Sequence, residues 1–121
     1  MTLTQQQKKE ALERFSKLIE SYSGHPDFIN VVMDIIELHS AKNQDYATAT
    51  DPFSNLRLCE RGGLPAWKGV IVRLGDKYSR LLNALKGVLF HFEGVEDAFK
   101  DTATYSLIGL ILYRESKREE S

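Results

Sequence analysis

The sequence predicts an all-α fold, a bundle of four main helices with a short connecting helix, in a single domain over residues 1–121. Apolar residues recur at spacings of three and four over most of the chain, as they do along one side of an α-helix. This periodicity fails only between residues 46 and 65, where a proline and a pair of glycines interrupt it. A chain of 121 residues is also long enough to bury one core, so one domain is expected.

The first two helices are predicted from their ends. The spacing of Thr4 and Gln7 predicts a capping box, which opens an N-terminal helix over residues 4–22. Ser23 and Gly24 close it. Pro26 suits the first turn of a second helix, which runs to about residue 43. Six residues make the apolar side of that helix: Phe28, Val31, Val32, Ile35, Ile36 and Leu38.

The middle of the chain is predicted to hold the connecting helix and the third main helix. Asp51 followed by Pro52 reads as an N-cap and a first-turn proline, opening a short helix through Leu58. The third helix begins near Pro65. Its predicted apolar stripe is Trp67, Val70, Ile71, Leu74, Tyr78, Leu81, Leu82, Leu85 and Leu89, and its other side carries Arg73, Asp76, Lys77 and Arg80.

A fourth helix is predicted from near Gly94 to about residue 115, which completes a bundle over residues 26–115 and leaves 116–121 as a frayed tail. Its predicted core face is Val95, Phe99, Ala103, Ser106, Leu110 and Tyr113, and its acidic residues lie opposite that face. In the second half both sides are apolar, through Leu107, Ile108, Ile111 and Leu112. A helix that is apolar nearly all round needs a second contact, which predicts a homodimer or a higher homo-oligomer.

Composition excludes several function classes. The formal net charge of −1 gives no overall basic field, so direct nucleic-acid binding is not expected. The single cysteine, Cys59, permits neither an intrachain disulfide nor a cysteine-built zinc site and suits a reducing cytoplasm. The polar N-terminus does not read as a signal peptide, and the longest apolar stretch, 106–113, is too short to span a bilayer. The expected location is the cytoplasm, of the host cell if a phage encodes the chain.

Carboxylates on two helices are the strongest chemical signal. Asp34 and Glu37 share one face of the second helix, and Glu93, Asp97 and Asp101 share one face near the start of the fourth. Like charges stacked along a helix are mildly destabilising unless a cation lies nearby. Oxygen ligands suit Mg²⁺ or Mn²⁺, so these five residues are candidate metal ligands.

Four of these five carboxylates also have a structural explanation. The helix dipole favours negative charge at the start of the fourth helix, which accounts for Glu93 and Asp97 without a metal. Asp34 and Glu37 could form an ordinary solvated surface. Asp101 lies beyond the first turn, so the dipole does not readily explain it.

Basic residues could supply phosphate contacts. Lys42 ends the second helix, and Arg73, Lys77 and Arg80 share a side of the third. Arginine binds phosphate oxygens through two hydrogen bonds at once. Alternatively, Lys42 offsets the helix dipole, and the other three are solvated partners of Asp76. Asp45, three residues after Lys42, is a candidate for a metal or ribose contact.

Four segments in this order resemble one family. They are KNQDYA at 42–47, DPFSN at 51–55, VRLGDKYSRL at 72–81 and EDAFKDTATY at 96–105. They are similar to segments of the nucleotide-modification-associated domain, type one, which is rich in phage proteins. This family in turn looks like a relative of the MazG-type all-α nucleoside triphosphate pyrophosphohydrolases, whose magnesium lies between an ExxE helix and an ExxD helix.

The resemblance implies a fold, an activity and a site. Asp34 and Glu37 match the first acidic motif with Asp in the leading place. Asp101 matches the last residue of the second, but Ala98 stands where its acidic partner belongs, so Asp97 would substitute. The implied protein is a MazG-like, magnesium-dependent hydrolase of nucleoside triphosphates, with Glu37, Asp97 and Asp101 as catalytic residues. The substrate-binding residues would be Lys42, Asp45, Tyr46, Asn55, Arg73, Lys77 and Arg80.

Two other classes of function remain open. One is a non-catalytic module that binds a nucleotide or a partner enzyme in a DNA-modification or anti-defence system. The other is a purely structural interaction domain, which would bind neither metal nor nucleotide.

Overall fold

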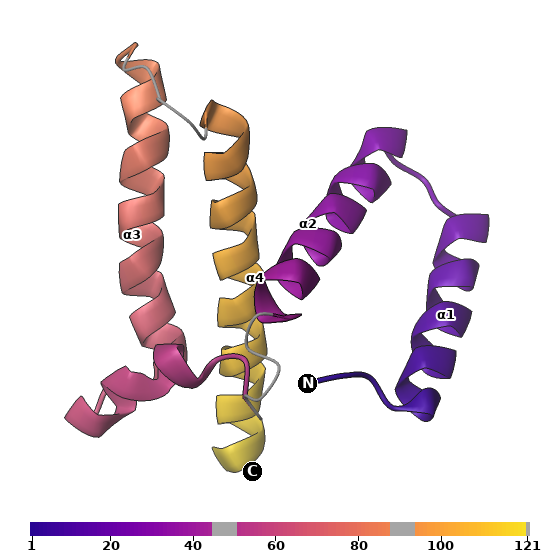
Figure 1. Ribbon diagram of the computed structural model, residues 1–121, viewed down its shortest axis with the longest axis horizontal. Coiled ribbons are helices and arrows are strands. Elements are labelled where there is room, and N and C mark those ends of the chain that lie inside the picture. The colour runs from indigo at the N-terminus through magenta and orange to yellow at the C-terminus, as the bar shows by residue number, and fades with distance from the viewer. Residues whose placement is uncertain (45–50, 88–93, 121) are drawn as a thin grey trace. The chain divides into compact units, whose positions relative to one another are not determined.

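The computed structural model describes residues 1–44, 51–87 and 94–120. Its elements are all helical, in the order α1, α2, η1, α3 and α4 (Figure 1). Over these described ranges there is no β-strand, and no helix is long and apolar enough to cross a membrane. The predicted all-α class is therefore confirmed. The chain divides into two compact units, Met1–Pro52 and Phe53–Ser121.

The N-terminal unit, Met1–Pro52, holds α1 (Gln5–Glu20) and α2 (Pro26–Gln44). The predicted capping box is confirmed, because Thr4 Oγ1 accepts the Gln7 N–H at 3.1 Å and Gln7 Oε1 accepts the Thr4 N–H at 2.9 Å. Together these bonds satisfy two of the donors that a helix start leaves unpaired. Ile35 is the buried residue of α2, whereas most of its predicted apolar side is exposed: Phe28, Val31, Val32 and Ile36.

The C-terminal unit, Phe53–Ser121, begins with η1 (Ser54–Gly62), a 3₁₀ helix. The predicted cap by Asp51 is wrong, because Phe53 occupies the N-cap position and makes no side-chain cap hydrogen bond. Burial of Phe53 in the core fixes this start instead. Gly63 ends the element with a φ of 86°, a left-handed conformation that glycine adopts without steric cost.

The two longest helices, α3 (Ala66–Leu85) and α4 (Gly94–Glu120), lie side by side and antiparallel (Figure 1). They approach closely at Gly109, where an added Cβ would lie 3.2 Å from Val70 Cγ1. One turn away the rings of Trp67 and Tyr113 pack edge to face, with centroids 5.2 Å apart and planes at 89°. These contacts fix the register of the pair.

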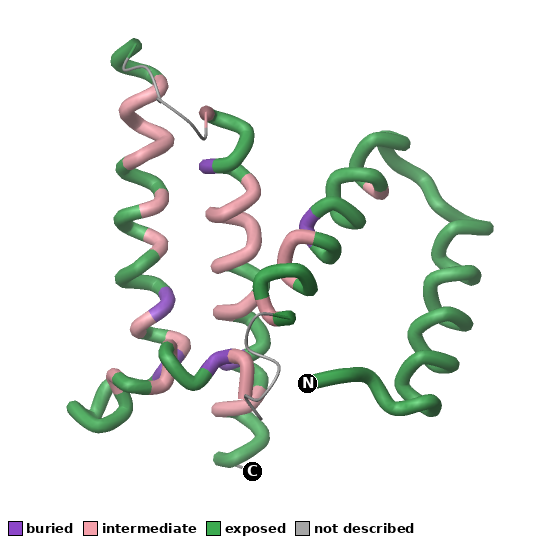
Figure 2. Tube along the Cα trace, in the orientation of Figure 1, coloured by how far each residue is buried: buried purple, intermediate pink, exposed green. Residues whose placement is uncertain are grey.

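The core of this unit lies where η1, α3 and α4 meet. Its buried members are Phe53, Ala66, Val70 and Leu112, and Leu56, Trp67, Leu74, Tyr105 and Ile108 pack against them. Figure 2 shows buried and half-buried positions along the facing sides of α3 and α4, with exposed positions between them. Complete burial of one such aliphatic side chain stabilises the fold by about 1.5–3 kcal/mol, so these few residues carry much of its stability.

The predicted core face of α4 is wrong. Val95, Phe99 and Leu110 are all exposed, Phe99 by 61%. The buried residues are Ala98 and Leu112, and the side they define faces α3. Because apolar residues occur nearly all round the second half of α4, periodicity alone did not select a single face. Asp101, three residues after Ala98, therefore lies on the side toward α3 rather than opposite it.

The apolar stripe predicted for α3 is also partly wrong. Ile71, Tyr78 and Leu85 belong to the predicted apolar stripe of α3 but are exposed. Leu89 lies outside the described residues.

The helix α4 continues past residue 115 to Glu120, where Lys117 Nζ lies 3.3 Å from the Glu120 carboxylate. A carboxylate three residues from a lysine on one helix face gives this last turn a favourable charge pair.

Candidate functional site

An ion pair between α3 and α4 joins two of the predicted site residues. Lys77 Nζ lies 2.8 Å from Asp101 Oδ2. The side chains of Lys77 and Asp101 are only 26% and 24% exposed, so the pair is partly removed from water. Lys77 Nζ also lies 4.9 Å from the centre of the Tyr105 ring, one turn beyond Asp101. The ammonium group thus has two favourable electrostatic partners on α4.

Helical spacing places these side chains together. Lys77 follows the half-buried Leu74 by three residues, so its stem leaves α3 on the side that faces α4. Asp101 stands between Ala98 and Tyr105 on the matching side of α4. A carboxylate in this position requires a cation, because its desolvation would otherwise be costly. Lys77 meets that requirement.

Hydroxyl groups around Asp101 are committed to the helix backbone. Thr102 Oγ1 donates to the Ala98 carbonyl at 2.8 Å, and Thr104 Oγ1 donates to the Lys100 carbonyl at 2.8 Å. Ser106 Oγ donates to the Thr102 carbonyl at 3.0 Å. These bonds to the residue four positions earlier satisfy the hydroxyls locally. Among the residues that the structure describes, none of the three hydroxyls donates to a base, as a hydroxyl nucleophile would.

Asp97 lies one turn before Asp101, in the first turn of α4. It is exposed and makes no ion pair with any residue that the structure describes. Its neighbour Glu96 lies 3.9 Å from Lys100 Nζ, a weak pair along the helix surface. The helix dipole accounts for Asp97 at this position without a metal. As an unpaired carboxylate beside Asp101, it also provides oxygen donors of the type that Mg²⁺ prefers.

The other predicted phosphate ligands on α3 flank Lys77. Arg73 lies one turn earlier and is exposed, whereas Arg80 lies one turn later and is half-buried. By the antiparallel register, Arg80 is level with the first turn of α4, where Asp97 lies. The sequence also allowed Lys77 to pair with Asp76 on its own helix. In the structure Lys77 instead forms its ion pair with Asp101 on α4.

The remaining described site residues belong to other elements. Asp34 and Glu37 are exposed and one turn apart on α2, in the N-terminal unit. Lys42 is exposed in the last turn of α2, and next to it Asn43 Nδ2 donates to the His39 carbonyl at 2.8 Å, a local contact of the type that ends helices. Asn55 is exposed in the first turn of η1.

Three predicted site residues, Asp45, Tyr46 and Glu93, lie outside the described residues. Over residues 1–44, 51–87 and 94–120, no three His, Cys, Asp or Glu side chains gather into a group able to hold a metal ion. The full predicted ligand set therefore stays a prediction. The Asp101 carboxylate is instead paired with the Lys77 ammonium group, at 2.8 Å.

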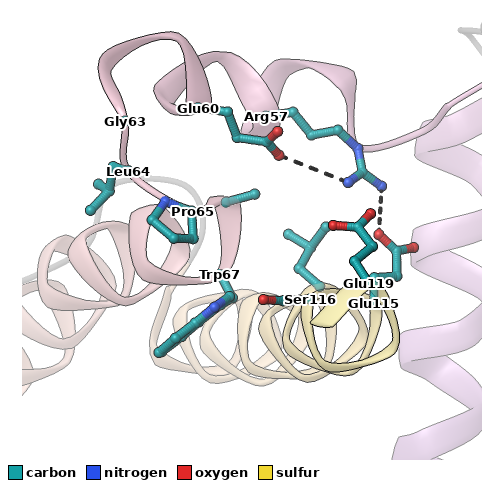
Figure 3. Close-up of a pocket in the computed structure, with 11 residues that line it drawn as sticks. Arg57, Glu60, Gly63, Leu64, Pro65, Trp67, Glu115, Ser116 and Glu119 are labelled. Carbon is teal, nitrogen blue, oxygen red and sulfur yellow. Dashed lines mark hydrogen bonds and ion pairs between the residues drawn. The ribbon is translucent and has the colours of Figure 1, made fainter. Parts of the chain in front are cut away.

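The C-terminal unit also contains a pocket of about 320 Å³ that the sequence did not reveal (Figure 3). Arg57 Nη2 lies 2.9 Å from Glu115 Oε2, and Arg57 Nη1 lies 4.0 Å from Glu60 Oε1. Trp67 and Pro65 line the opposite part of the pocket. Arg57 and Glu115 are far apart in sequence, and no local spacing links them, so no pattern could have paired them.

The sequence matches no family model, no curated protein and no solved structure. The resemblance to the nucleotide-modification-associated domain therefore stays a prediction.

Proposed function

We propose that this protein is a magnesium-dependent nucleoside triphosphate pyrophosphohydrolase that acts in phage or bacterial nucleotide metabolism. The observation that supports it best is the Lys77–Asp101 contact of 2.8 Å. It joins one residue from each of two segments that the family resemblance identifies, Lys77 as the proposed phosphate ligand and Asp101 as the proposed metal ligand. Neither residue is a near neighbour of the other in sequence, so the contact is more than a local charge pair.

In this proposal, acidic residues bind the metal and basic residues bind the phosphates. Asp97 and Asp101 of α4 would bind Mg²⁺ or Mn²⁺, and the family resemblance also implies Asp34, Glu37 and Glu93 as ligands. Bound metal would polarise a phosphoryl oxygen and lower the pKa of an attacking water. Lys77, Arg73 and Arg80 neutralise phosphate charge from α3, together with Lys42. Asp45, Tyr46 and Asn55 would hold the base and sugar.

The assembly is part of the proposal. We propose that the helices form a MazG-like bundle and that the chain is a homodimer or a higher homo-oligomer. Three apolar residues on the second half of α4 are exposed: Leu107, Leu110 and Ile111. An exposed apolar face of this kind is typical of a surface that packs against another subunit. Ile111→Asp should therefore lower the oligomeric mass measured by light scattering. A strict monomer for the unmodified chain at micromolar concentration would contradict the oligomer.

The activity is tested with a panel of ribo- and deoxyribonucleoside triphosphates, with pyrophosphate release measured in Mg²⁺, in Mn²⁺ and in chelator. Asp101→Asn should abolish metal-dependent release. Glu96→Gln is the matched control, because Glu96 is an exposed acid in the same helix and is not a proposed ligand. Its activity should match that of the unmodified chain. Asp34→Asn and Glu37→Gln then test the contribution of α2. Failure of every nucleotide to turn over would remove the enzyme proposal.

One observation also favours a non-catalytic module that binds a nucleotide or a partner enzyme in a DNA-modification or anti-defence system. Lys77 already supplies the cation that Asp101 needs, so the fold requires no metal there. The basic side of α3 would still attract phosphate. Calorimetry separates the two, because nucleotide binding that is unchanged by chelator supports the module. Absence of both nucleotide and metal binding would indicate a structural interaction domain.

A further inference from the structure

The pocket of about 320 Å³ in the C-terminal unit lies apart from the Lys77–Asp101 contact. Its walls come from η1, the first turn of α3 and the last turns of α4 (Figure 3). Trp67, which lines the pocket, precedes Lys77 by ten residues on α3. At a rise of about 1.5 Å per residue, that spacing is about 15 Å along the helix. The pocket is therefore separate from the proposed nucleotide site.

The charged side chains of the pocket are mostly acidic. Three carboxylates line it, Glu60 from η1 and Glu115 and Glu119 from α4, against the single cation Arg57. The Arg57 guanidinium is already engaged, because its nitrogens lie 2.9 Å from Glu115 Oε2 and 4.0 Å from Glu60 Oε1. Glu119 is exposed and makes no ion pair with any residue that the structure describes. The lining therefore has an excess of negative charge.

The hydroxyl of Ser116, which also lines the pocket, differs from the other serine and threonine hydroxyls of α4. Thr102, Thr104 and Ser106 each donate to the carbonyl four residues earlier, as hydroxyls inside helices commonly do. Ser116 is half-buried and makes no hydrogen bond with the described part of the chain. Its oxygen can therefore accept a hydrogen bond from a ligand.

The opposite wall of the pocket is apolar. Leu64, Pro65 and Ala66 contribute to it at the start of α3. Figure 3 shows Leu64 and Pro65 across the pocket from Arg57 and Glu119. A molecule in the pocket would therefore meet carbon atoms on one side and carboxylates on the other.

From these groups we propose that the pocket binds a small organic cation, an ammonium or guanidinium group on a short aliphatic stem. The free oxygens of Glu119 and Ser116 accept hydrogen bonds, and both kinds of cation carry several N–H donors and no acceptor. Such a bond to a carboxylate is about twice as strong as one between neutral groups. The volume is at the lower end of the range for ligand pockets, about 300–1,000 Å³, which suits a stem of a few carbon atoms against the apolar wall.

The test uses the full chain and the fluorescence of Trp67, which is the single tryptophan of the sequence and lines the pocket. The probe is n-butylguanidinium, and n-butylurea is its neutral counterpart of nearly the same shape. The cation should change the Trp67 emission saturably, with a Kd of about 1 mM, and the urea should not. Added salt should weaken the binding of the cation, because charges at a partly exposed site are screened.

Two substitutions locate the binding. Glu119→Gln should raise the Kd of n-butylguanidinium by about fivefold, because the carboxylate is lost but its charge is partly screened by water. Ser116→Ala should raise it by about fivefold through the loss of one acceptor. Glu120→Gln is the matched control, because it makes the same charge change one residue later, outside the pocket and beside Lys117. Its Kd should equal that of the unmodified chain, and thermal melting establishes that each variant is folded.

A further probe, Nα-acetylarginine amide, separates two sources of the cation. If it binds as tightly as n-butylguanidinium, the pocket accepts an arginine side chain of a partner protein. If only n-butylguanidinium binds, the pocket accepts a free small cation.

Three results would overturn the proposal. One is an equal response to n-butylguanidinium and n-butylurea, and another is equal weakening by Glu119→Gln and Glu120→Gln. The third is the absence of binding by every probe, in both fluorescence and calorimetry. Since none of these measurements involves nucleotide turnover, their outcome leaves the hydrolase proposal to its own test.

Discussion

The close contact of η1 with α3 at Gly69 gives a sharp prediction about packing. An ideal Cβ built on Gly69 would lie 2.8 Å from Cys59 Sγ and 3.7 Å from Cys59 Cβ. Favourable contacts between side-chain carbon atoms begin near about 3.5 Å, so a methyl group at this position would collide with the sulfur. The sulfur is held in place, since Cys59 Sγ donates to the Leu56 carbonyl at 3.6 Å.

Gly69→Ala therefore has two opposing effects. Alanine in a helix interior is favoured over glycine by about 1 kcal/mol. Overpacking a well-filled contact costs about 1–3 kcal/mol. The cost of the collision exceeds the gain in helix propensity, so the free energy of unfolding should fall by up to about 2 kcal/mol.

The control lies in the same helix. Nothing lies within 4 Å of a Cβ on Gly75. Gly75→Ala should therefore raise the free energy of unfolding by about 0.5–1 kcal/mol, through helix propensity alone. Opposite signs for two glycine-to-alanine changes six residues apart would be difficult to explain without the η1–α3 contact.

Urea denaturation followed by circular dichroism measures these differences, and a double-mutant cycle assigns the cause. With Cys59→Ala present, Gly69→Ala no longer meets a sulfur atom and should cost at least about 1 kcal/mol less than it does alone. The reasoning is refuted if Gly69→Ala stabilises the chain as much as Gly75→Ala does. It is also refuted if the cost of Gly69→Ala is unchanged by the loss of the sulfur.

Four further substitutions test three other contacts by urea denaturation. Asp101→Asn should lower the free energy of unfolding of the metal-free protein by about 1–2 kcal/mol, because Lys77 loses its ionised partner, and no loss would contradict the ion pair. Arg57→Ala and Glu115→Gln should show a coupling of about 0.5–1 kcal/mol, because the pair is close but about one third exposed, and additive effects would contradict it. Leu112→Ala should cost about 2–5 kcal/mol, because Leu112 is 3% exposed in the core, and a cost below 1 kcal/mol would place it at the surface.

The helices were predictable because their signals are local. The capping box of Thr4 and Gln7 acts over four consecutive residues, and the first-turn proline of α2 acts within a single turn. The left-handed glycine at position 63 similarly ends η1 from within the segment itself. These effects depend on backbone geometry that a short sequence determines. They therefore identified helices in the right order, although η1 begins and ends later than predicted, at Ser54 and Gly62, and α4 continues to Glu120.

The facing sides of α3 and α4 were not predictable in the same way. Phe99 and Leu110 are apolar at helical spacing, yet they are exposed, whereas Asp101 lies on the inner side. A hydrophobic pattern assumes that charge is excluded from the interface. Here Lys77 supplies the opposite charge from the other helix, and that pairing depends on a register set by Val70 and Gly109 far along the chain.

The candidate site was also predicted only in part, because some of its contacts join residues that are far apart in the sequence. The sequence placed Lys77 and Asp101 in one functional site because their segments resemble one family, and the structure brings the two side chains into contact. It gave no indication that Tyr105 would join them, although Tyr105 is one turn from Asp101. Aromatic residues at that spacing are most often packing residues, so only the position of Lys77 reveals the cation–π contact.

The central claim is that Asp101 and Lys77 belong to a metal-dependent site for nucleoside triphosphates. The most direct measurement is single-turnover pyrophosphate release from the nucleotide panel by the unmodified chain, Asp101→Asn and Glu96→Gln, each in Mg²⁺ and in chelator. The account predicts release by the unmodified chain and by Glu96→Gln in Mg²⁺ only, and none by Asp101→Asn. Release by Asp101→Asn at the unmodified rate, or no release by any of the three proteins, would contradict it.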